Sequence, residues 1–311
     1  LTIAGDIIDG KSKSGSVGSD TVSKALLDAL AKKDLKALVV RVDSPGGSAL
    51  VSEDMRRAIL EAKAQKLPVV ISMGSLAASG GYWVSTAGDV IFAEPTTITG
   101  SIGIFGIIPT FENTLKKIGL TTDGVRTTPL SGQPDIYGGT NAETDTIFQA
   151  GIENGYQEFI TRVATARKLT PARVDEIGQG RVWDGGTAHQ IGLVDRFGGL
   201  QDAIDEAAKR AGLKATDVHA EYLEKKPSAF MQLIAQILDS NKDDDASAGD
   251  AFTRMATERR AVFARALGDV KRIGTGAAIQ ARCLECDGLG GTQPQPGDAT
   301  LLTLVLARFG L

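Results

Sequence analysis

Short apolar runs and longer amphipathic stretches alternate over the first 120 residues. We predict strands near residues 2–8, 37–42, 68–73, 89–93 and 102–108, where the apolar runs are short and contain β-branched residues. Helices are predicted near residues 19–33, 50–66, 79–87 and 111–118. In the first of these, an apolar stripe follows the candidate cap Ser19 and comprises Leu26, Leu27, Leu30 and Ala31. The alternation predicts an α/β fold with a mainly parallel sheet and covering helices.

The second half of the chain is first helical and then changes character. A long helix is predicted from about residue 142 to 168, followed by the capping pair Thr170-Pro171, a short helix, and helical stretches at 184–190 and 201–211. After about Leu223, an apolar stretch (230–238) gives way to a polar linker (241–250) and an arginine-rich stretch (251–269), for which a surface helix is favoured over a membrane-contacting one. We therefore expect a folded domain over residues 1–225, a helical and linker extension over 226–290, and a poorly ordered tail over 291–311.

Composition narrows the class of protein. The 311 residues are 42% hydrophobic and 23% charged, which suits a folded body with a sizeable core. The net charge of −4 comes from interspersed acidic and basic residues with no basic stripe, so nucleic acid is not an expected partner. No apolar stretch reaches the roughly 18–20 residues that span a bilayer, and no leader pattern opens the chain. We expect any membrane anchor to lie outside these residues.

Two loops of small residues carry the candidate chemistry. Ser79 follows the predicted strand 68–73 in the run Gly-Ser-Leu-Ala-Ala-Ser-Gly-Gly-Tyr-Trp (74–83). A serine at a strand-to-helix turn can present its hydroxyl as a nucleophile, because glycine and alanine allow close approach and a helix N-terminus favours negative charge. The strand 37–42 ends in a second loop, where Gly46 and Gly47 could open a helix and aim backbone N–H groups at an oxyanion. Either loop alone is equally well an ordinary turn; together they favour a catalytic site.

These loops belong to a longer ordered set of motifs. The set comprises Ser-Pro-Gly-Gly-Ser (44–48), Ala-Ala-Ser-Gly-Gly-Tyr-Trp (77–83), Thr-Gly-Ser-Ile-Gly-Ile-Phe-Gly (99–106), Gly-Arg-Val-Trp (180–183) and Ile-Gly-Leu-Val-Asp (191–195). In this order the chain resembles the signal peptide peptidase A, or protease IV, family over roughly residues 1–225. The resemblance implies a ClpP/crotonase-like fold and a membrane-associated serine protease.

The resemblance also implies roles for individual residues. It makes Ser79 the nucleophile, Gly46 and Gly47 the oxyanion donors, and Ser101 a hydroxyl that orients a lysine base. The sequence around Ser101 is equally typical of a tight turn. We expect Tyr82 and Trp83 to pack behind the serine. Apolar or small substrate side chains are expected to be preferred, given candidate pockets around Leu76, Ile98, Ile104 and Phe105.

The lysine base is missing from the place where the family's short members carry it. A serine–lysine dyad needs a neutral amine, so the lysine must be desolvated. The corresponding region here reads Thr-Thr-Pro-Leu-Ser-Gly-Gln-Pro (127–134), and no lysine occurs between Lys117 and Lys168. The family's long form holds two copies of the fold, with the lysine in the N-terminal copy and the serine in the C-terminal copy. We interpret this chain, which starts at Leu1, as the C-terminal copy and expect the base from an absent N-terminal copy.

The same resemblance implies partners and a location. Expected substrates are cleaved signal peptides and other membrane-associated peptides, and a homo-oligomer, with a tetramer favoured, is expected. The resemblance places the protein at the bacterial inner membrane with its catalytic domain facing the periplasm. No metal, nucleotide or other cofactor is implied.

Several remaining residues carry weaker signals. Cys283 and Cys286 form a lone Cys-x-x-Cys, for which two ordinary cysteines are favoured, then a local disulfide, over half a zinc site or a redox pair. A Ser-His-Asp triad would need His189 or His219 near Ser79, but neither lies in a motif that shapes the cleft. Should the chain prove to carry its own base, Lys13 and the histidines come first. Lys116 and Lys117 are expected to be exposed and charged.

Two other classes of function stay open. A crotonase-type acyl-CoA enzyme would use the same kind of oxyanion hole on a thioester without a nucleophilic Ser79. A non-catalytic assembly module would fold and oligomerise without turnover, and an isolated C-terminal copy fits that description.

Overall fold

The computed structural model describes residues 1–13, 15–32, 34–223, 279–283 and 285–286. Leu1–Leu223 and Gly276–Thr292 group into one compact unit, and Glu224–Thr275 with Gln293–Leu311 into a second. The predictions for the apolar stretch, the linker, the arginine-rich stretch and the tail lie outside the described residues. Within the described part of the chain, no helix combines the length and the apolar character needed to cross a membrane.

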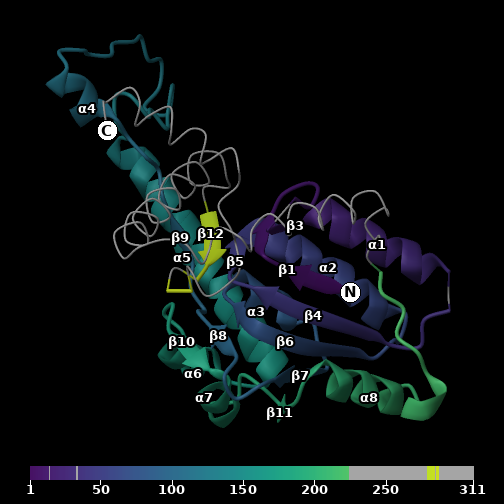
Figure 1. Cartoon of the computed structure of the whole chain (residues 1–311). Helices are drawn as coiled ribbons and strands as arrows, with labels where there is room; N and C mark the ends of the chain where they lie inside the picture. Colours follow the sequence, from purple (N-terminus) through teal and green to yellow (C-terminus); the bar gives the residue numbers. More distant parts are fainter. Residues whose placement is uncertain (14, 33, 224–278, 284, 287–311) are drawn as a thin grey trace, which may run out of the picture. The chain divides into compact units, whose positions relative to one another are not determined.

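The order of elements confirms the predicted alternation of strands and helices (Figure 1). The helices are α1 (Ser19–Ala31), α2 (Ala49–Ala64), α3 (Gly80–Ser85), α4 (Glu112–Lys117), α5 (Ala142–Arg167), α6 (Pro171–Ile177), α7 (Gly185–Gln190) and α8 (Leu200–Arg210), with a 3-10 turn at Ala215–Asp217. The strands are β1 (Thr2–Ala4), β2 (Asp6–Ile8), β3 (Ser16–Gly18), β4 (Leu38–Ser44), β5 (Gly46–Ser48), β6 (Val69–Ala78), β7 (Val90–Ala93), β8 (Ile98–Gly100), β9 (Phe105–Gly106), β10 (Val182–Asp184), β11 (Arg196–Phe197) and β12 (Ile279–Arg282).

A mainly parallel sheet forms the centre of the first unit. Its strands run in the order β1-β4-β6-β7-β11, and β8 pairs with the far end of β6. Along β4, Val40 belongs to the large core on the α1 and α2 side, whereas Val39 packs with the cluster under α8. This alternation follows from the two-residue period of a strand, and it buries both faces of the sheet. The predicted α/β fold with a parallel sheet and covering helices is therefore confirmed.

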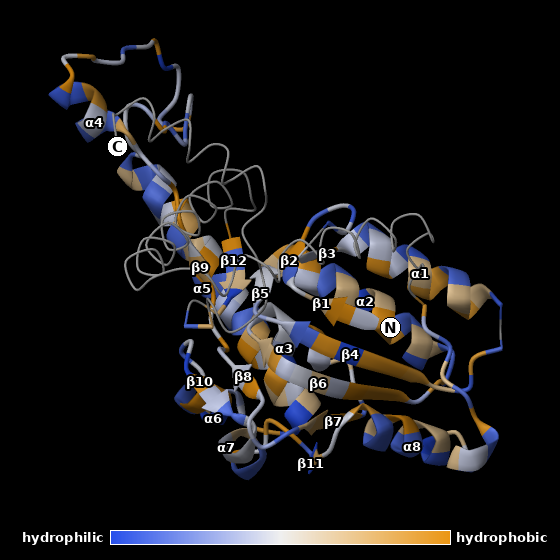
Figure 2. Cartoon of the chain, viewed as in Figure 1, coloured by the Kyte–Doolittle hydropathy of each residue, from blue (hydrophilic) through white to orange (hydrophobic). Residues whose placement is uncertain are grey.

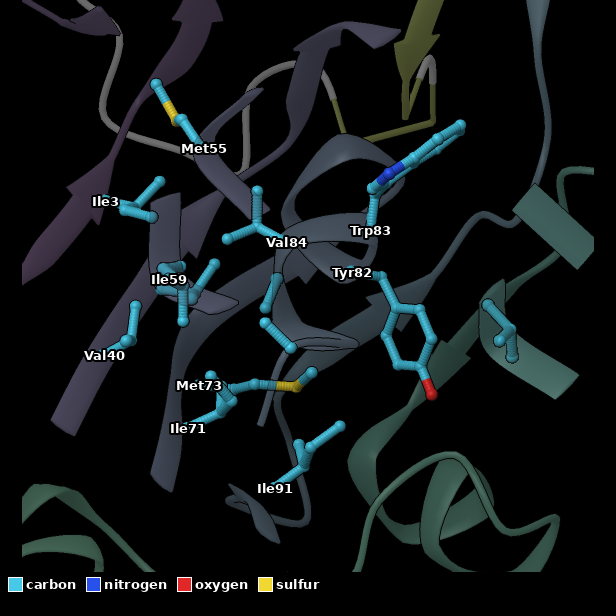
Figure 3. Packing of buried hydrophobic residues seen from close by; sticks show 14 of the residues in the cluster. Ile3, Val40, Met55, Ile59, Ile71, Met73, Tyr82, Trp83, Val84 and Ile91 are labelled. Carbon is cyan, nitrogen blue, oxygen red and sulfur yellow. The ribbon is translucent and has the colours of Figure 1, made fainter. Parts of the chain in front are cut away.

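The helices that cover the sheet bury apolar side chains against it. Leu26 and Leu30 of α1 are at most 3% exposed, as predicted, but Leu27 (51% exposed) and Ala31 are exposed, so half of the predicted stripe was wrong. The N-cap position is Gly18 and not the predicted Ser19. Figure 2 shows the apolar strands β1 and β4 flanked by helices whose ribbons mix apolar and polar residues. Close packing between α2, the sheet and α3 is seen in Figure 3, where the labelled side chains include Met55, Ile59, Ile71 and Val84.

A second, smaller sheet lies where the first strand breaks. The predicted strand 2–8 is divided at Gly5 (φ 82°), so that β1 joins the large sheet and β2 joins the small one. The order in the small sheet is β3-β2-β5-β12-β9. Gly46 and Gly47, which we expected in a helix-opening turn, instead form β5, and α2 begins at Ala49 with Ser48 as its cap. The expectation that these glycines open a helix was wrong, because β12 pairs with both of them and β2 pairs with Gly47.

The predicted strand 102–108 was also wrong for most of its length. Only Phe105–Gly106 is a strand. The residues just before this strand contact a loop and do not pair with another strand. The N–H of Gly180 donates to the carbonyl of Ile102 (2.9 Å), and a Cβ on Gly103 would lie 3.0 Å from Gly180. Ile102 is fully buried, so its apolar character reflects core packing without strand pairing.

The long predicted helix is α5, and its end is as the sequence indicates. Thr170 caps α6 by accepting a hydrogen bond from the N–H of Arg173 (3.2 Å), with Pro171 in the first turn. α5 is joined to the core through Phe159, whose ring lies 4.5 Å from that of Trp83.

Candidate active site

Ser79 lies at the turn between β6 and α3, in a backbone conformation that few residues adopt. Its φ of 52° and ψ of −114° place a non-glycine residue at positive φ. Two backbone hydrogen bonds hold it there: its N–H donates to the carbonyl of Gly100 (2.8 Å), and its carbonyl accepts from the N–H of Trp83 (2.8 Å). Strained positions of this kind persist only where the surrounding structure fixes them, and they cluster at functional sites.

The hydroxyl of Ser79 is buried without a partner. The residue is 0% exposed, and within the described part of the chain its Oγ has no hydrogen-bond partner. Leaving a buried hydroxyl unpaired costs about 1–3 kcal/mol, so such a group in a folded protein calls for an explanation. A proton acceptor that belongs to another chain or segment would supply one.

Ser101 occupies the equivalent position on the neighbouring strand. Ala78 of β6 pairs with Gly100 of β8, so Ser79 and Ser101 follow directly after paired residues. Ser101 is also at positive φ (49°) and is 3% exposed, and its N–H donates to the carbonyl of Arg181 (2.7 Å). The structure thus brings the two serines together at one end of the sheet.

Gly46 lies against the start of α3. A Cβ on Gly46 would lie 2.6 Å from the N atom of Gly80, so only glycine allows this approach, and its φ of 98° also favours glycine. The N–H of Gly46 donates to Oγ of Ser44 (3.1 Å). Gly47 pairs with Ile7 on one edge and Ala281 on the other. Gly46 therefore lies beside the Ser79 turn with its amide engaged by a side chain, and Gly47 follows it within β5.

The two cysteines are joined in a disulfide, which corrects the favoured reading of two ordinary cysteines. Cys283 follows β12, and its N–H donates to the carbonyl of Pro45 (2.8 Å). The sulfurs pack with Leu76 and Ala78, and with the partly buried Ile98 and Val182. Sequence spacing alone could not show that a segment so far along the chain returns to the end of β6, where burial brings the two side chains together.

Comparisons with known proteins agree with this geometry. Residues 61–214 match peptidase family S49. A putative protease from Synechocystis is 35% identical over 213 residues, which cover 68% of this chain and 76% of that protein. The chain belongs to peptidase family S49. It is also 46% identical over 226 residues to Protease 4 of Salmonella typhi and 44% identical over 207 residues to Protease 4 of Haemophilus influenzae. These matches confirm the resemblance to the protease IV family.

The match to the longer relatives is partial. It covers 73% of this chain but 36% of the Salmonella protein, and 67% of this chain but 34% of the Haemophilus protein. This S49 chain therefore corresponds to about a third of the length of those two relatives.

Two motifs further along this S49 chain, residues 180–183 and 191–195, make hydrogen bonds that hold the structure around the site. Arg181 accepts the Ser101 amide through its carbonyl, and Nε1 of Trp183 donates to the carbonyl of Ile177 (3.0 Å). Asp195 accepts a hydrogen bond from the N–H of Ile91 (2.8 Å) and forms a two-pronged ion pair with Arg167 (2.8 and 2.6 Å). Burial raises the pKa of Asp195, but Arg167 lowers it more, so the pKa lies below its ordinary value.

Tyr82 and Trp83 lie in the core beneath Ser79. The Tyr82 hydroxyl donates to the carbonyl of Leu193 (2.8 Å), and burial raises the pKa of Tyr82 well above its ordinary value. Nε1 of Trp83 donates to Oε2 of Glu53 (2.8 Å). Neither side chain is free for proton transfer, and both hold α3 in place.

Sequence reasoning missed Glu53, a carboxylate of α2 that is 7% exposed. It accepts hydrogen bonds from Arg56 (2.8 Å), Arg57 (2.9 Å) and Arg162 (2.9 Å) as well as from Trp83. Burial raises the pKa of Glu53, but these donors lower it to well below its ordinary value of 4.5. The only sequence signal was the Glu-x-x-Arg-Arg spacing on one helix face; Arg162 comes from α5 and has no local pattern to reveal it.

The other titratable candidates do not reach the nucleophile. His189, His219 and Lys13 are exposed, and His189 stacks against Phe197 (4.7 Å). Lys116 and Lys117 are exposed on α4, as predicted. None of these five is bonded to Oγ of Ser79, which has no partner among the described residues.

Proposed function

We propose that this chain carries the nucleophilic half of a serine endopeptidase that works through a serine–lysine dyad. The observation that supports it most is the Ser79 hydroxyl, which is buried at a strained strand-to-helix turn and has no hydrogen-bond partner among the residues that the structure describes. A lysine amine arriving from an N-terminal copy of the fold would satisfy that hydroxyl and take its proton. The site would desolvate the lysine and hold it neutral near pH 7.

The reaction is acyl transfer. Oγ of Ser79 attacks the peptide carbonyl carbon as its proton passes to the lysine amine, and the carbonyl oxygen becomes an oxyanion. Gly46 and Gly47 stabilise this oxyanion through their N–H groups, for which the Gly46 amide must first exchange its bond with Ser44. The lysine then protonates the leaving amine, and water releases the acyl group from Ser79. Ser101 orients the lysine through its hydroxyl.

The proposed substrates are cleaved signal peptides and other membrane-associated peptides with apolar or small side chains near the cut. An apolar cluster beside the serine supports this preference: Leu76, Ile98 and Val182 belong to it, and the two cysteine side chains fill it in this structure. An acyl-CoA enzyme is disfavoured because the family match is to peptidases.

Location and assembly are part of the same proposal. The disulfide supports a domain that faces an oxidising compartment such as the periplasm, with the anchor supplied outside these residues. A homo-oligomer, with a tetramer favoured, is supported by exposed apolar side chains between β9 and α5: Ile118 is 66% exposed and Val125 is 99% exposed.

The nucleophile is tested by Ser79→Ala in a full-length protein that includes the lysine-bearing copy. We expect hydrolysis of an apolar fluorogenic peptide to fall to background with an unchanged melting temperature, because the substitution removes one buried unpaired atom from a site of small residues. The matched control is Ser75→Ala, an exposed serine of the same strand, which should retain activity. Near wild-type turnover by Ser79→Ala would refute the assignment.

A further inference from the structure

β12 lies on the edge of the strand that carries the candidate oxyanion donors. Ala281 and Arg282 of β12 pair antiparallel with Gly47 and Gly46 of β5, and Gln280 pairs with Phe105 of β9 on the other edge. Addition of an extended segment to a strand edge is a common way for proteins to bind peptides. The place between β5 and β9 is therefore already taken by an extended segment, and that segment is the chain's own.

The backbone of this segment lies against the residues around the nucleophile. A Cβ on Gly80 would lie 3.0 Å from the carbonyl oxygen of Ala281, and a Cβ on Gly46 would overlap the same oxygen. The Ala281 carbonyl thus lies between Gly46 and Gly80, the residue after Ser79, close to where the proposed reaction needs a substrate carbonyl. Ser79 is 0% exposed in this arrangement, so the nucleophile is closed to solvent.

The side chains that follow β12 fill the apolar cluster beside the serine. Cys283 is 0% exposed and Cys286 is 2% exposed, and they contact Leu76 and Ala78. Because they are joined in a disulfide, the two cysteine side chains form one compact apolar group. A substrate side chain cannot enter the cluster while the disulfide occupies it.

An ion pair adds a third anchor. Arg282 lies 3.5 Å from Asp6 of β2, and the two side chains are 14% and 8% exposed. Together with the pairing on β5 and β9 and the Cys283 amide bond to Pro45, this makes β12 a built contact of the unit.

We propose that β12 is an internal occupant of the peptide groove, held there by the Cys283–Cys286 disulfide, and that substrates bind in its place as extended strands antiparallel to β5. The proposal rests on the peptidase function proposed above. A dithiol opens the groove: it breaks the Sγ–Sγ bond, each cysteine sulfur takes a proton, and the dithiol becomes a disulfide. The two separate thiols no longer pack as one compact group, and the pairing of β12 with β5 opens more often.

Amide hydrogen exchange measures the release of β12 directly. We compare the oxidised chain, the chain reduced by dithiothreitol, and the Cys283→Ser, Cys286→Ser double variant, each carrying Ser79→Ala so that no catalysis intervenes. Exchange at residues 46–48 and 279–283 should rise on the order of tenfold in the reduced chain and in the double variant, because the constraint on the loop is lost. Amides of Val40 and Ile71, in the central strands, serve as controls and should not change. Unchanged exchange at β5 and β12, with free thiols verified by mass, would overturn the proposal.

Peptide binding then tests what the groove takes. The probe is a fluorescein-labelled peptide that copies residues 277–283 with serine in place of the cysteine, and a scrambled peptide is the control. Fluorescence anisotropy should show on the order of tenfold tighter binding to the reduced chain and to the double variant, and dithiothreitol should have no effect on the double variant. Arg282→Gln, which weakens the docking of β12 without touching the disulfide, should also bind the probe more tightly than the oxidised wild type. Equal affinity in all four samples would refute the proposal, and because neither readout needs hydrolysis, this failure is distinct from a failure of the peptidase assignment.

Discussion

The two sides of the candidate site are built differently. The serine side, with Ser79 and Ser101, rests on the large parallel sheet and on α3, whose Tyr82 and Trp83 reach into a continuous core. The glycine side, with Gly46 and Gly47, rests on short strands of the small sheet, one of which comes from near residue 280. Ser79 is therefore fixed by the core itself, whereas Gly46 and Gly47 depend on short strands, among them β12.

The difference is clearest in the hydrogen bonds. Ser79 is held by two backbone bonds and leaves its hydroxyl free for a partner. Gly46 has its amide bonded to Ser44. In the proposed reaction the serine side needs no rearrangement, whereas the Gly46 amide must exchange its bond with Ser44 before it can stabilise an oxyanion.

Disrupting the glycine side should have the largest effect on stability. In Gly47→Ala the new Cβ would overlap the carbonyl oxygen of Ile7, a backbone atom that cannot move aside cheaply. We expect a loss of about 3 kcal/mol in the free energy of unfolding, measured by urea denaturation. Gly124→Ala is the control, since nothing lies within 4 Å of its Cβ position. Equal stability of the two variants would show that β5 is not tightly packed on β2.

Breaking the support of the serine side should have a somewhat smaller effect. Glu53→Gln removes the charge that pairs with Arg56 and Arg162, whose side chains are 17% and 18% exposed. We expect a loss of about 2–3 kcal/mol near neutral pH, because two largely buried guanidinium groups lose their carboxylate. Glu61→Gln, at an exposed position of the same helix, should be neutral. A neutral Glu53→Gln would mean that the α2–α5 bridge does not stabilise α3.

Lower pH should reduce the loss of stability that Glu53→Gln causes. The folded-state pKa of Glu53 lies below its ordinary value of 4.5, so its charge stabilises the fold fully above that value and this contribution is lost as the pH falls toward the folded-state pKa. The stability difference between wild type and Glu53→Gln should therefore shrink between pH 7 and pH 3. A difference that stays constant over this range would contradict the lowered pKa.

Ser101→Ala should have the mildest effect on the fold and a partial one on activity. If Ser101 positions the lysine, loss of its hydroxyl should lower kcat/KM and move the acidic limb of the pH profile to higher pH. The measurement is peptide hydrolysis by the full-length protein from pH 6 to pH 10. A reduced rate with an unshifted profile would leave Ser101 as a turn residue that only shapes the backbone.

The contrast between the two sides also shows what the sequence could predict. Strands such as β4 and β6, and helices such as α1 and α5, follow from periodicity and caps, because local pattern and burial agree there. The Ser79 turn could be located from its small residues, although the strand before it was predicted to end at residue 73 and β6 continues to Ala78. Ile102 was misread because a buried apolar residue in a loop looks like a strand residue.

Contacts between segments far apart in the sequence could not be predicted from it. The three residues of β5, two of them glycine, carry no strand signal, and their pairing with β12 joins positions more than 200 residues apart. The Arg162 bond to Glu53 and the packing of the disulfide on Leu76 depend in the same way on tertiary placement. No local propensity encodes such contacts.

The central claim is that the base for Ser79 is a lysine from outside the described residues. Reconstitution tests this claim most directly. Hydrolysis of an apolar fluorogenic peptide is measured for the 311-residue chain alone, with an N-terminal copy of the fold added, and with the same copy after its dyad lysine is changed to alanine, each with β12 released by dithiothreitol. The account predicts turnover only with the intact copy, because an unassisted serine hydroxyl is a poor nucleophile near neutral pH. Robust turnover by the purified chain alone would contradict it and would require a base within this sequence.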